Sequence, residues 1–278
     1  MSGKLFLVGT PIGNLSDISP RTAETLAMVD FIAAEDTRVT RKLLSHLDLH
    51  KPLISYYEHN RRESAERILP RLLAGENGAL VSDAGMPAIS DPGEELVKLC
   101  AENGVEVITI PGPCALICAL AASGLPTQRF AFEGFLAVSG RNRWARLDEL
   151  RTEPRTLVLY EAPHKLIKTL TDLLKYLGDR DVALCRELTK VHEEVRRTTL
   201  SAALAYYEHE PPRGEFVLVI RGAPETQDPE TTLEDGLELV AVYRSEGISL
   251  REAARRVAAE TGLPKNLLYS QSLGREDR

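Results

Sequence analysis

The chain has 278 residues, 43% of them hydrophobic and 27% charged, and a net charge of −7. This length can bury a substantial core and is typical of two or three domains. No apolar stretch reaches the roughly 20 residues that a membrane-spanning helix needs, and a strand pattern stands where a signal peptide would have its apolar region, so we expect a cytoplasmic protein without membrane attachment. The four cysteines lack C-x-x-C spacing, and no metal is expected.

The first 123 residues alternate apolar strand patterns with helical patterns. This order is typical of a parallel sheet with right-handed crossovers and predicts an α/β fold. The strands are expected at residues 4–8, 31–34, 53–55, 79–81 and 106–110. Ser19 followed by Pro20 marks the start of one helix. The apolar stretch at 114–122 predicts a buried helix that docks against this sheet with its N-terminus at a ligand cleft.

A composition change after residue 123 marks a second α/β domain, residues 124–221. Its strands are expected at 130–135, 156–160, 182–185, 194–199 and 215–220, and its helices near 141–150, 165–177 and 201–207. Residues 222–229 read as a polar, proline-bounded linker.

The remaining residues, up to 278, form a small helical appendage. Its helices are expected at 233–243, at 249–259 with Gly262 as C-cap, and from Pro264 through Leu268. The segment from 249 to 265 is similar to a helix-turn-helix, which would bind nucleic acid. A packing or dimer-stabilising tail is the open alternative.

Three glycine- and proline-rich loops follow strands of the first domain. They occupy residues 9–15, 82–93 and 111–116. An open α/β sheet binds ligands beyond the carboxyl ends of its strands, so the three loops predict one small-molecule pocket. Neither glycine-rich phosphate motif is present, because Pro11 stands where a second glycine would be and no lysine follows. A nucleotide phosphate is therefore disfavoured.

These loops, together with residues 34–38, 57–60, 132–136 and 187–194, resemble the tetrapyrrole methylase superfamily. The resemblance spreads over roughly two hundred residues, as expected of a whole chain rather than a single motif. It implies two α/β domains with S-adenosylmethionine in the cleft between them, and a homodimer. Within the superfamily the similarity is greatest to members that methylate the ribose 2′-oxygen of a cytidine in the decoding centre of 16S ribosomal RNA, in the small ribosomal subunit.

The resemblance also implies which residues contact the cofactor. In the first domain they are Gly9, Thr10, Pro11, Ile12, Asp83, Ala84, Gly85, Met86, Pro111, Gly112, Cys114 and Ala115. In the second domain they are Tyr160, Glu161, Ala162, Gly214 and Glu215.

Methyl transfer to a ribose hydroxyl needs alignment of the reactants and benefits from a general base. Glu35 and Asp36 follow the second strand, so either carboxylate could take the proton while Arg38 binds the adjacent phosphate. Lys190 is the competing base. The alternative for residues 35–38 is an acidic helix N-cap beside a surface arginine.

Local cations could offset the overall negative charge in RNA binding. Residues 36–71 hold eight Lys/Arg against five acids, and residues 141–146 interleave cations with Trp144, which would either stack on a base or pack with Leu147 in the core.

Two other functions stay open. One is methylation of a tetrapyrrole or a protein amine by the same fold, and the other is a ligand-sensing DNA-binding regulator.

Overall fold

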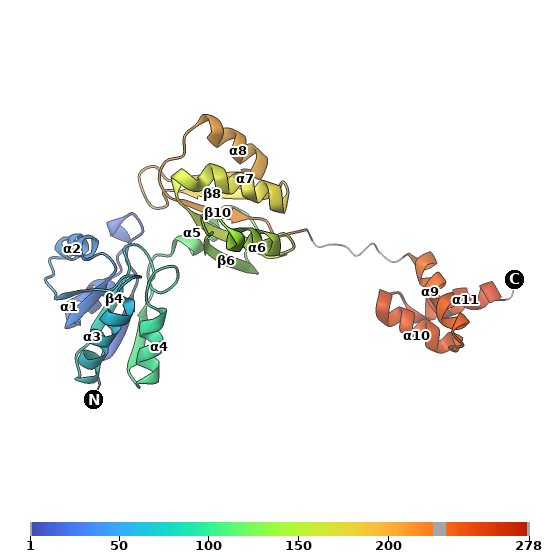
Figure 1. The fold of residues 1–278 in the computed structure, drawn as a ribbon, viewed down its shortest axis with the longest axis horizontal. Helices are drawn as coiled ribbons and strands as arrows, with labels where there is room; N and C mark the ends of the chain where they lie inside the picture. Colours follow the sequence, from blue (N-terminus) through green and yellow to red (C-terminus); the bar gives the residue numbers. More distant parts are fainter. Residues whose placement is uncertain (1, 225–231, 277–278) are drawn as a thin grey trace. The chain divides into compact units, whose positions relative to one another are not determined.

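The computed structural model describes residues 2–224 and 232–276, and the chain divides into two compact units, Met1–Ala223 and Pro224–Arg278. The first unit contains two five-stranded sheets, and the described part of the second is helical (Figure 1). The predicted α/β class with a helical appendage is confirmed. The further division of the first unit at residue 123 stays a prediction, and most of the expected linker lies outside the described residues.

The first sheet is parallel, with strand order β3-β2-β4-β1-β5. Its strands are β1 (Lys4–Val8), β2 (Phe31–Ala34), β3 (Leu53–Ser55), β4 (Gly78–Val81) and β5 (Glu106–Ile110). The strands β2 and β4 are buried at every position, which explains why their sequences read as continuous runs of small and apolar residues rather than as alternating ones. Four of the five strands have the predicted bounds, and β4 starts one residue earlier.

Helices cover both faces of this sheet. A short 3-10 turn, η1 (Leu15–Asp17), follows β1. The helices α1 (Pro20–Met28) and α2 (Thr37–His46) pack on one face through Leu26, Leu43 and Leu44. The helices α3 (Arg61–Leu73) and α4 (Glu94–Glu102) pack on the other face through Ile68, Leu72 and Leu96. Burial on both faces leaves the strand ends and their loops as the accessible part of the sheet.

The second sheet is mixed, with strand order β6-β7-β10-β8-β9. Its strands are β6 (Phe130–Phe135), β7 (Thr156–Glu161), β8 (Asp181–Arg186), β9 (Glu194–Thr199) and β10 (Phe216–Ile220). Only the β6–β7 pair is parallel, and the other three pairs are antiparallel. The helices α6 (Arg141–Leu150), α7 (Leu166–Leu177) and α8 (Leu200–His209) cover one face, and the short turn η2 (Pro163–Lys165) precedes α7.

The helix α5 (Ala115–Ser123) covers the other face of the second sheet, where Leu116, Ala119 and Leu120 pack against strand residues such as Val158 and Val219. The expectation that this apolar helix docks on the first sheet is therefore wrong. Both faces of the first sheet are already covered by α1 to α4, whereas the second sheet would otherwise expose an apolar face that includes Val158, Val217 and Val219. Its N-cap, Cys114, stands between the two sheets.

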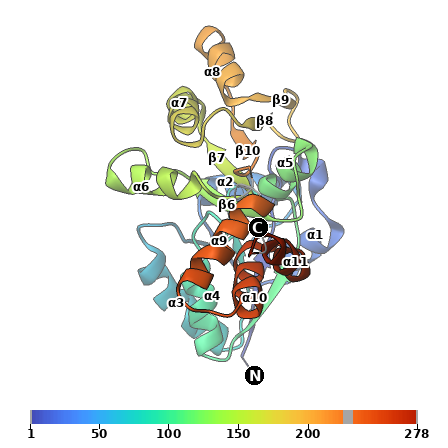
Figure 2. The same cartoon turned by 90° about the vertical axis from the view of Figure 1, so that its right-hand side faces the viewer.

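The second unit consists of α9 (Leu233–Ser245), α10 (Leu250–Thr261) and α11 (Lys265–Glu276), which pack on one another around Leu237, Val257 and Leu268 (Figure 2). Gly262 ends α10 in the left-handed conformation, with φ of 73°, as predicted. The last helix continues beyond the predicted end at Leu268. Within residues 2–224 and 232–276, none of the helices has the length and apolar character that crossing a membrane requires.

Candidate active site

The loops that follow β1, β4 and β5 are joined to one another. Thr10 and Gly85 exchange two backbone hydrogen bonds, of 2.9 Å and 3.1 Å, which link the first loop to the second. A Cβ added at Gly9 would lie 2.7 Å from the Cα of Gly112, so the first and third loops touch backbone to backbone. Only glycine allows this approach.

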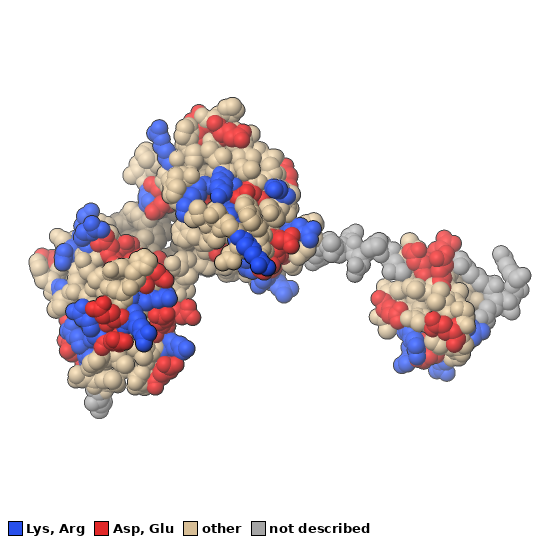
Figure 3. Space-filling model, in the orientation of Figure 1, with Lys and Arg blue, Asp and Glu red and all other residues tan. Residues whose placement is uncertain are grey.

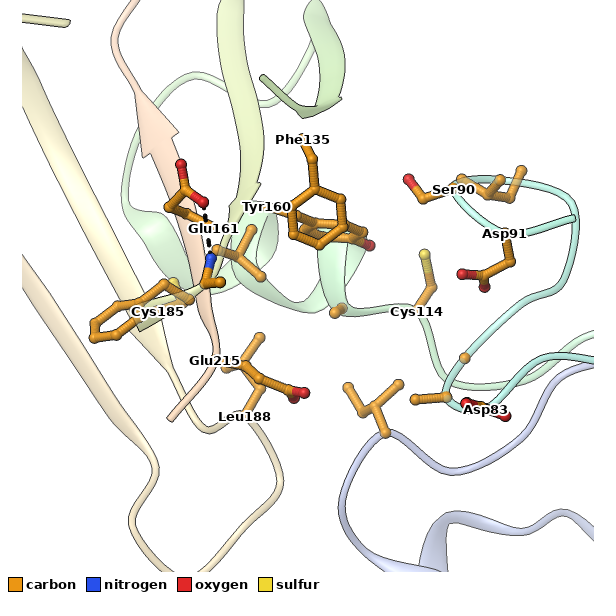
Figure 4. Close-up of a pocket in the computed structure, with 18 of the residues that line it drawn as sticks. Asp83, Ser90, Asp91, Cys114, Phe135, Tyr160, Glu161, Cys185, Leu188 and Glu215 are labelled. Carbon is orange, nitrogen blue, oxygen red and sulfur yellow. Dashed lines mark hydrogen bonds between the residues drawn. The ribbon is translucent and has the colours of Figure 1, made fainter. Parts of the chain in front are cut away.

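A cavity of about 510 Å³ opens between these loops and the second sheet. Figure 4 shows Asp83, Ser90 and Asp91 on one side of the cavity, and Cys185, Leu188 and Glu215 on the other. Loops and strand ends from both sheets thus form one concave site of a size that holds a small molecule.

Thirteen of the residues singled out from the sequence line this cavity. They are Ile12, Glu35, Asp83, Ala84, Gly85, Met86, Cys114, Ala115, Tyr160, Glu161, Ala162, Lys190 and Glu215. Eight others do not line it: Gly9, Thr10, Pro11, Asp36, Arg38, Pro111, Gly112 and Gly214. Several of these eight support the site instead. Gly9, Thr10 and Gly112 hold the loops together, and Gly214 packs against the side chain of Glu187.

Three carboxylates converge on the first-sheet side of the cavity: Glu35, Asp83 and Asp91. Burial raises the pKa of each, and for Glu35 the negative charges of Asp91 and Asp83 raise it further. Like charges held together in a partly buried site favour a bound cation or a bound proton. The site is therefore suited to a positively charged ligand and to proton transfer.

Asp36 and Arg38 have a different environment. The Asp36 carboxylate accepts hydrogen bonds from the Arg38 guanidinium and from its backbone N–H, which lower the pKa of Asp36 to about 2. It is the N-cap of α2, while its own backbone N–H donates to Asp83 Oδ1 at 3.0 Å. Asp36 thus has the capping role that the sequence offered as the alternative to catalysis, and its lowered pKa makes it a poor proton acceptor. The Arg38 side chain is 83% exposed, and its charge acts on Asp83 of the cavity wall.

Lys190 lines the cavity from the loop between β8 and β9. Its Nζ donates to Glu187 Oε1 at 2.9 Å and to Glu215 Oε2 at 3.0 Å. Burial alone would lower the pKa of the ammonium group, but these two carboxylates outweigh burial and raise it. Lys190 therefore stays protonated at neutral pH and is unsuited to be the general base.

The loop that carries Lys190 is held in an unusual conformation. Glu187 and Thr189 have positive φ values of 51° and 65°, a region that costs energy for residues other than glycine. A Cβ at Gly13 would lie 2.4 Å from Lys190 Cγ, so the first loop packs directly on this segment. Contact with the first sheet's loop thereby positions Lys190.

The second sheet gives the cavity an apolar wall. Phe135 and Tyr160 meet edge to face with ring centroids 5.6 Å apart, and the Tyr160 hydroxyl accepts a hydrogen bond of 3.1 Å from the backbone N–H of Leu116. Glu161 is buried, and its carboxylate accepts bonds from Thr169 and from the backbone N–H of Ala162. This wall combines apolar surface with polar groups that are already satisfied.

Eight residues of the lining were not assigned to the cofactor from the sequence. They are Ile89, Ser90, Asp91, Phe135, His164, Cys185, Leu188 and Val217. The first three belong to the 82–93 loop, which was predicted to line the pocket as a whole, and a loop that supplies one ligand contact often supplies more. Pro163 and Phe216 also line the cavity, and they belong to the segments 160–163 and 214–216 that were expected to close it from the second domain. Cys185 and Val217 lie within strands and read only as core. Across the described ranges, no three His, Cys, Asp or Glu side chains form a group able to hold a metal ion.

The cationic segment 141–146 has a structural role in the second sheet's core. Arg143 is buried and its guanidinium pairs with Asp172 at 2.8 Å, while Arg146 pairs with Glu133 at 2.7 Å. Trp144 stacks on Tyr176 with centroids 5.9 Å apart, and Leu147 is buried. The packing interpretation holds for most of this segment, although Trp144 lies at the surface rather than in the core.

A sequence profile of tetrapyrrole (corrin/porphyrin) methylases matches residues 4–204. The chain belongs to this family. It is 52% identical, over 98% of both chains, to the ribosomal RNA small subunit methyltransferase I of Synechocystis sp.. A protein of the same name from Thermotoga maritima is 49% identical over 220 residues, which are 79% of this chain and 99% of that protein.

Among solved structures, the chain is similar to a uroporphyrin-III C-methyltransferase from Thermus thermophilus in complex with S-adenyl homocysteine. The two share 21% identity with a TM-score of 0.56, over 78% of this chain and 97% of that one. This likeness shows that the two chains have the same fold. The match to the family profile confirms the superfamily inferred from the sequence.

Proposed function

We propose that this chain uses S-adenosylmethionine to methylate the ribose 2′-oxygen of a cytidine in 16S ribosomal RNA. It is a methyltransferase, and small-subunit ribosomal RNA is its substrate. The observation that carries this conclusion is the identity of 52% along 98% of the chain to a small-subunit ribosomal RNA methyltransferase. The cavity supports it, because most of its lining lies within the residues that match the family profile. The proposal also has finer parts. They are the 2′-oxygen as acceptor, the decoding-centre cytidine as target, action on the assembled subunit, a homodimer and a cytoplasmic location.

The residues of the cavity fit this cofactor. S-adenosylmethionine carries a sulfonium and an ammonium group against one carboxylate, so its net charge is positive. Glu35, Asp83 and Asp91 provide the opposite charge, and the apolar wall around Tyr160 suits an adenine ring. When bound, the cofactor supplies a methyl group made electrophilic by its sulfonium.

We assign proton removal to Glu35. With the cofactor bound, its methyl group would pass from sulfur to O2′, and the Glu35 carboxylate would accept the proton that the hydroxyl loses. Burial and its acidic neighbours raise the pKa of Glu35, which makes it a stronger base than an ordinary carboxylate. Asp36 is unsuited because its lowered pKa makes it a weak base, and Lys190 is unsuited because its raised pKa keeps it protonated. Arg38, at the cavity mouth, is placed to bind a phosphate beside the reacting ribose.

A DNA-binding regulator is less well supported. Residues 224–278 hold eleven Asp/Glu against seven Lys/Arg, which opposes binding to a nucleic-acid backbone. In α10, Arg255 and Arg256 both pair with Glu252, at 2.7 Å and 3.5 Å, so their charge is partly neutralised. The appendage therefore fits the packing interpretation better than the nucleic-acid reader.

A comparison of methyl acceptors tests the proposal. The protein is incubated with methyl-labelled S-adenosylmethionine and, separately, with small ribosomal subunits, protein-free 16S RNA, a tetrapyrrole or no acceptor. Label in RNA from either of the first two supports the proposal, and the better of them identifies the natural form of the substrate. Label in the tetrapyrrole alone would assign the chain to the other branch of its family. Absence of transfer to any acceptor, despite cofactor binding, would favour the regulator.

A further inference from the structure

The helix α2 presents a stripe of cations to solvent. Arg38, Arg41 and Lys42 are exposed at positions i, i+3 and i+4, which places them on one helix face. Thr40, Leu43 and Leu44 bury the opposite face against the first sheet. Arg41 and Lys42 form no ion pair with any residue of the described ranges. Their charge is therefore available to a partner.

The next cation-rich helix in the chain, α3, differs because three of its four cations are paired, and only Arg67 forms no ion pair among the described residues. On α3, Arg61 pairs with Glu58 at 3.1 Å and with Glu95 at 3.2 Å, Arg62 pairs with Glu66 at 3.6 Å, and Arg71 pairs with Glu76. In Figure 3, Lys and Arg atoms lie over α2 beside acidic atoms, and both signs of charge also mingle over α3. Within its own bounds α2 carries three cations and no acidic residue, whereas α3 carries four cations and two acidic residues.

A second, smaller hollow of about 370 Å³ lies where the end of α2 meets the chain leading into β3. Three basic side chains line it: Arg41 from α2, and His50 and Lys51 from the following turn. Lys51 Nζ donates to the backbone oxygen of Val29 at 2.8 Å, which fixes the ammonium group in place. Asp48, in the same turn, is exposed and does not line the hollow. The hollow has the size and charge to take a phosphate group.

The stripe begins at the active-site cavity. The backbone N–H of Asp36, the N-cap of α2, donates to Asp83 in the cavity wall. From Arg38 to Ser45, which also lines the hollow, the helix rises about 10 Å. A strand of nucleic acid whose reacting ribose lies in the cavity could therefore follow α2 with successive phosphates on these cations.

We propose that α2 and the hollow at its end form a binding track for the RNA backbone adjacent to the methylated nucleotide. Arg38 takes the phosphate next to the reacting ribose, Arg41 and Lys42 take the next along the strand, and Arg41, His50 and Lys51 close the track at the hollow. This inference rests on the proposed function. It adds a recognition surface that works without reading bases, since phosphate contacts fix register rather than sequence.

The test compares two matched double variants, Arg41→Gln/Lys42→Gln on α2 and Arg61→Gln/Arg62→Gln on α3. Each removes two adjacent, helix-borne charges, but only the α2 pair lies on the track. Binding to small subunits or their RNA is measured over a range of salt concentrations, with cofactor affinity and thermal unfolding as controls for the fold. Single-strand binding varies with salt by a logarithmic slope of about −0.7 for each phosphate contact.

The α2 variant is expected to lose about 1.4 from the magnitude of this slope for two lost contacts, and its KM for RNA to rise at least about tenfold at unchanged cofactor affinity. The α3 variant should match the wild type. Should the α2 variant be poorly folded, Lys42→Gln alone is expected to lose about half as much slope.

Equal effects of the two double variants on RNA binding would overturn the track, as would an α2 variant with the wild-type slope. An α2 variant that no longer binds inorganic phosphate but still binds RNA as the wild type does would make the hollow a site for small anions. That result would also overturn the track. In each of these results the wild type still methylates RNA. A wild type that neither binds nor methylates RNA would instead refute the proposed function.

Discussion

Replacing Asp83 by alanine is expected to separate cofactor binding from folding. The Asp83 carboxylate lines the cavity and accepts a hydrogen bond of 3.0 Å from the backbone N–H of Asp36, which joins the loops after β4 and β2. Asp30 provides a matched control at the other end of the same strands, because its carboxylate accepts a bond of 2.7 Å from the backbone N–H of Asn77. Both bonds are exposed, and both join segments 47 residues apart.

Each substitution removes one charge-assisted hydrogen bond, so each should cost about 1 to 2 kcal/mol of unfolding free energy after allowance for exposure. Only Asp83→Ala also removes a negative charge from the site of a cationic ligand. Its affinity for S-adenosylmethionine should fall at least about tenfold, or about 1.4 kcal/mol, while Asp30→Ala keeps the wild-type affinity. Calorimetric titration and thermal unfolding measure the two quantities. Equal affinities in the two variants would refute the assignment of the cavity.

Four further predictions follow from the site. Glu35→Gln should lower kcat by about 10²- to 10⁴-fold, and the fall of wild-type kcat as the pH drops through the raised pKa of Glu35 should disappear in a pH profile of the variant. Arg38→Ala should lower kcat/KM for RNA about tenfold to a hundredfold at unchanged cofactor Kd, with Arg38→Lys recovering only part; parallel loss of cofactor affinity would contradict this. Gly85→Val should abolish cofactor binding in titration, because φ is +90° there and the new Cβ would lie 3.3 Å from Ile12. Removal of residues 224–278 should leave cofactor Kd and the rate on saturating subunits unchanged, since the cavity is lined by residues of the first unit, and loss of either would give the appendage a part in the site.

The first sheet could be predicted from the sequence because its signals are local. Continuous apolar runs such as β2 and β4 end in loops rich in glycine and proline, and parallel strands bring those loops to one edge. The direction of the strands in the second sheet could not be predicted in this way. A strand that is buried on both faces of its sheet is apolar throughout, whether its neighbours are parallel or antiparallel. The sequence of β10 therefore gave no sign that it lies antiparallel to both of its neighbours.

The surface on which α5 packs could not be predicted from the sequence for a similar reason. An almost uniformly apolar helix has no polar face to orient it, so its pattern predicts burial but not the surface that buries it. At the site, Asp36 and Arg38 show a second limit. An acidic residue two positions before an arginine at a helix start is equally consistent with catalysis and with capping, and only the bonds between them showed the capping role. Cys185 and Val217 were missed because a strand residue that lines a cavity has the same sequence signal as one in the core.

The most direct test of the proposed function is the identity of the methylated nucleoside. Small subunits lacking the modification are incubated with the protein and methyl-labelled S-adenosylmethionine, and their RNA is then digested to nucleosides that are separated by mass and retention. We expect the label to appear in 2′-O-methylcytidine and Glu35→Gln to reduce it strongly. Label in a base-methylated nucleoside, or RNA without label while a tetrapyrrole is methylated, would contradict the account.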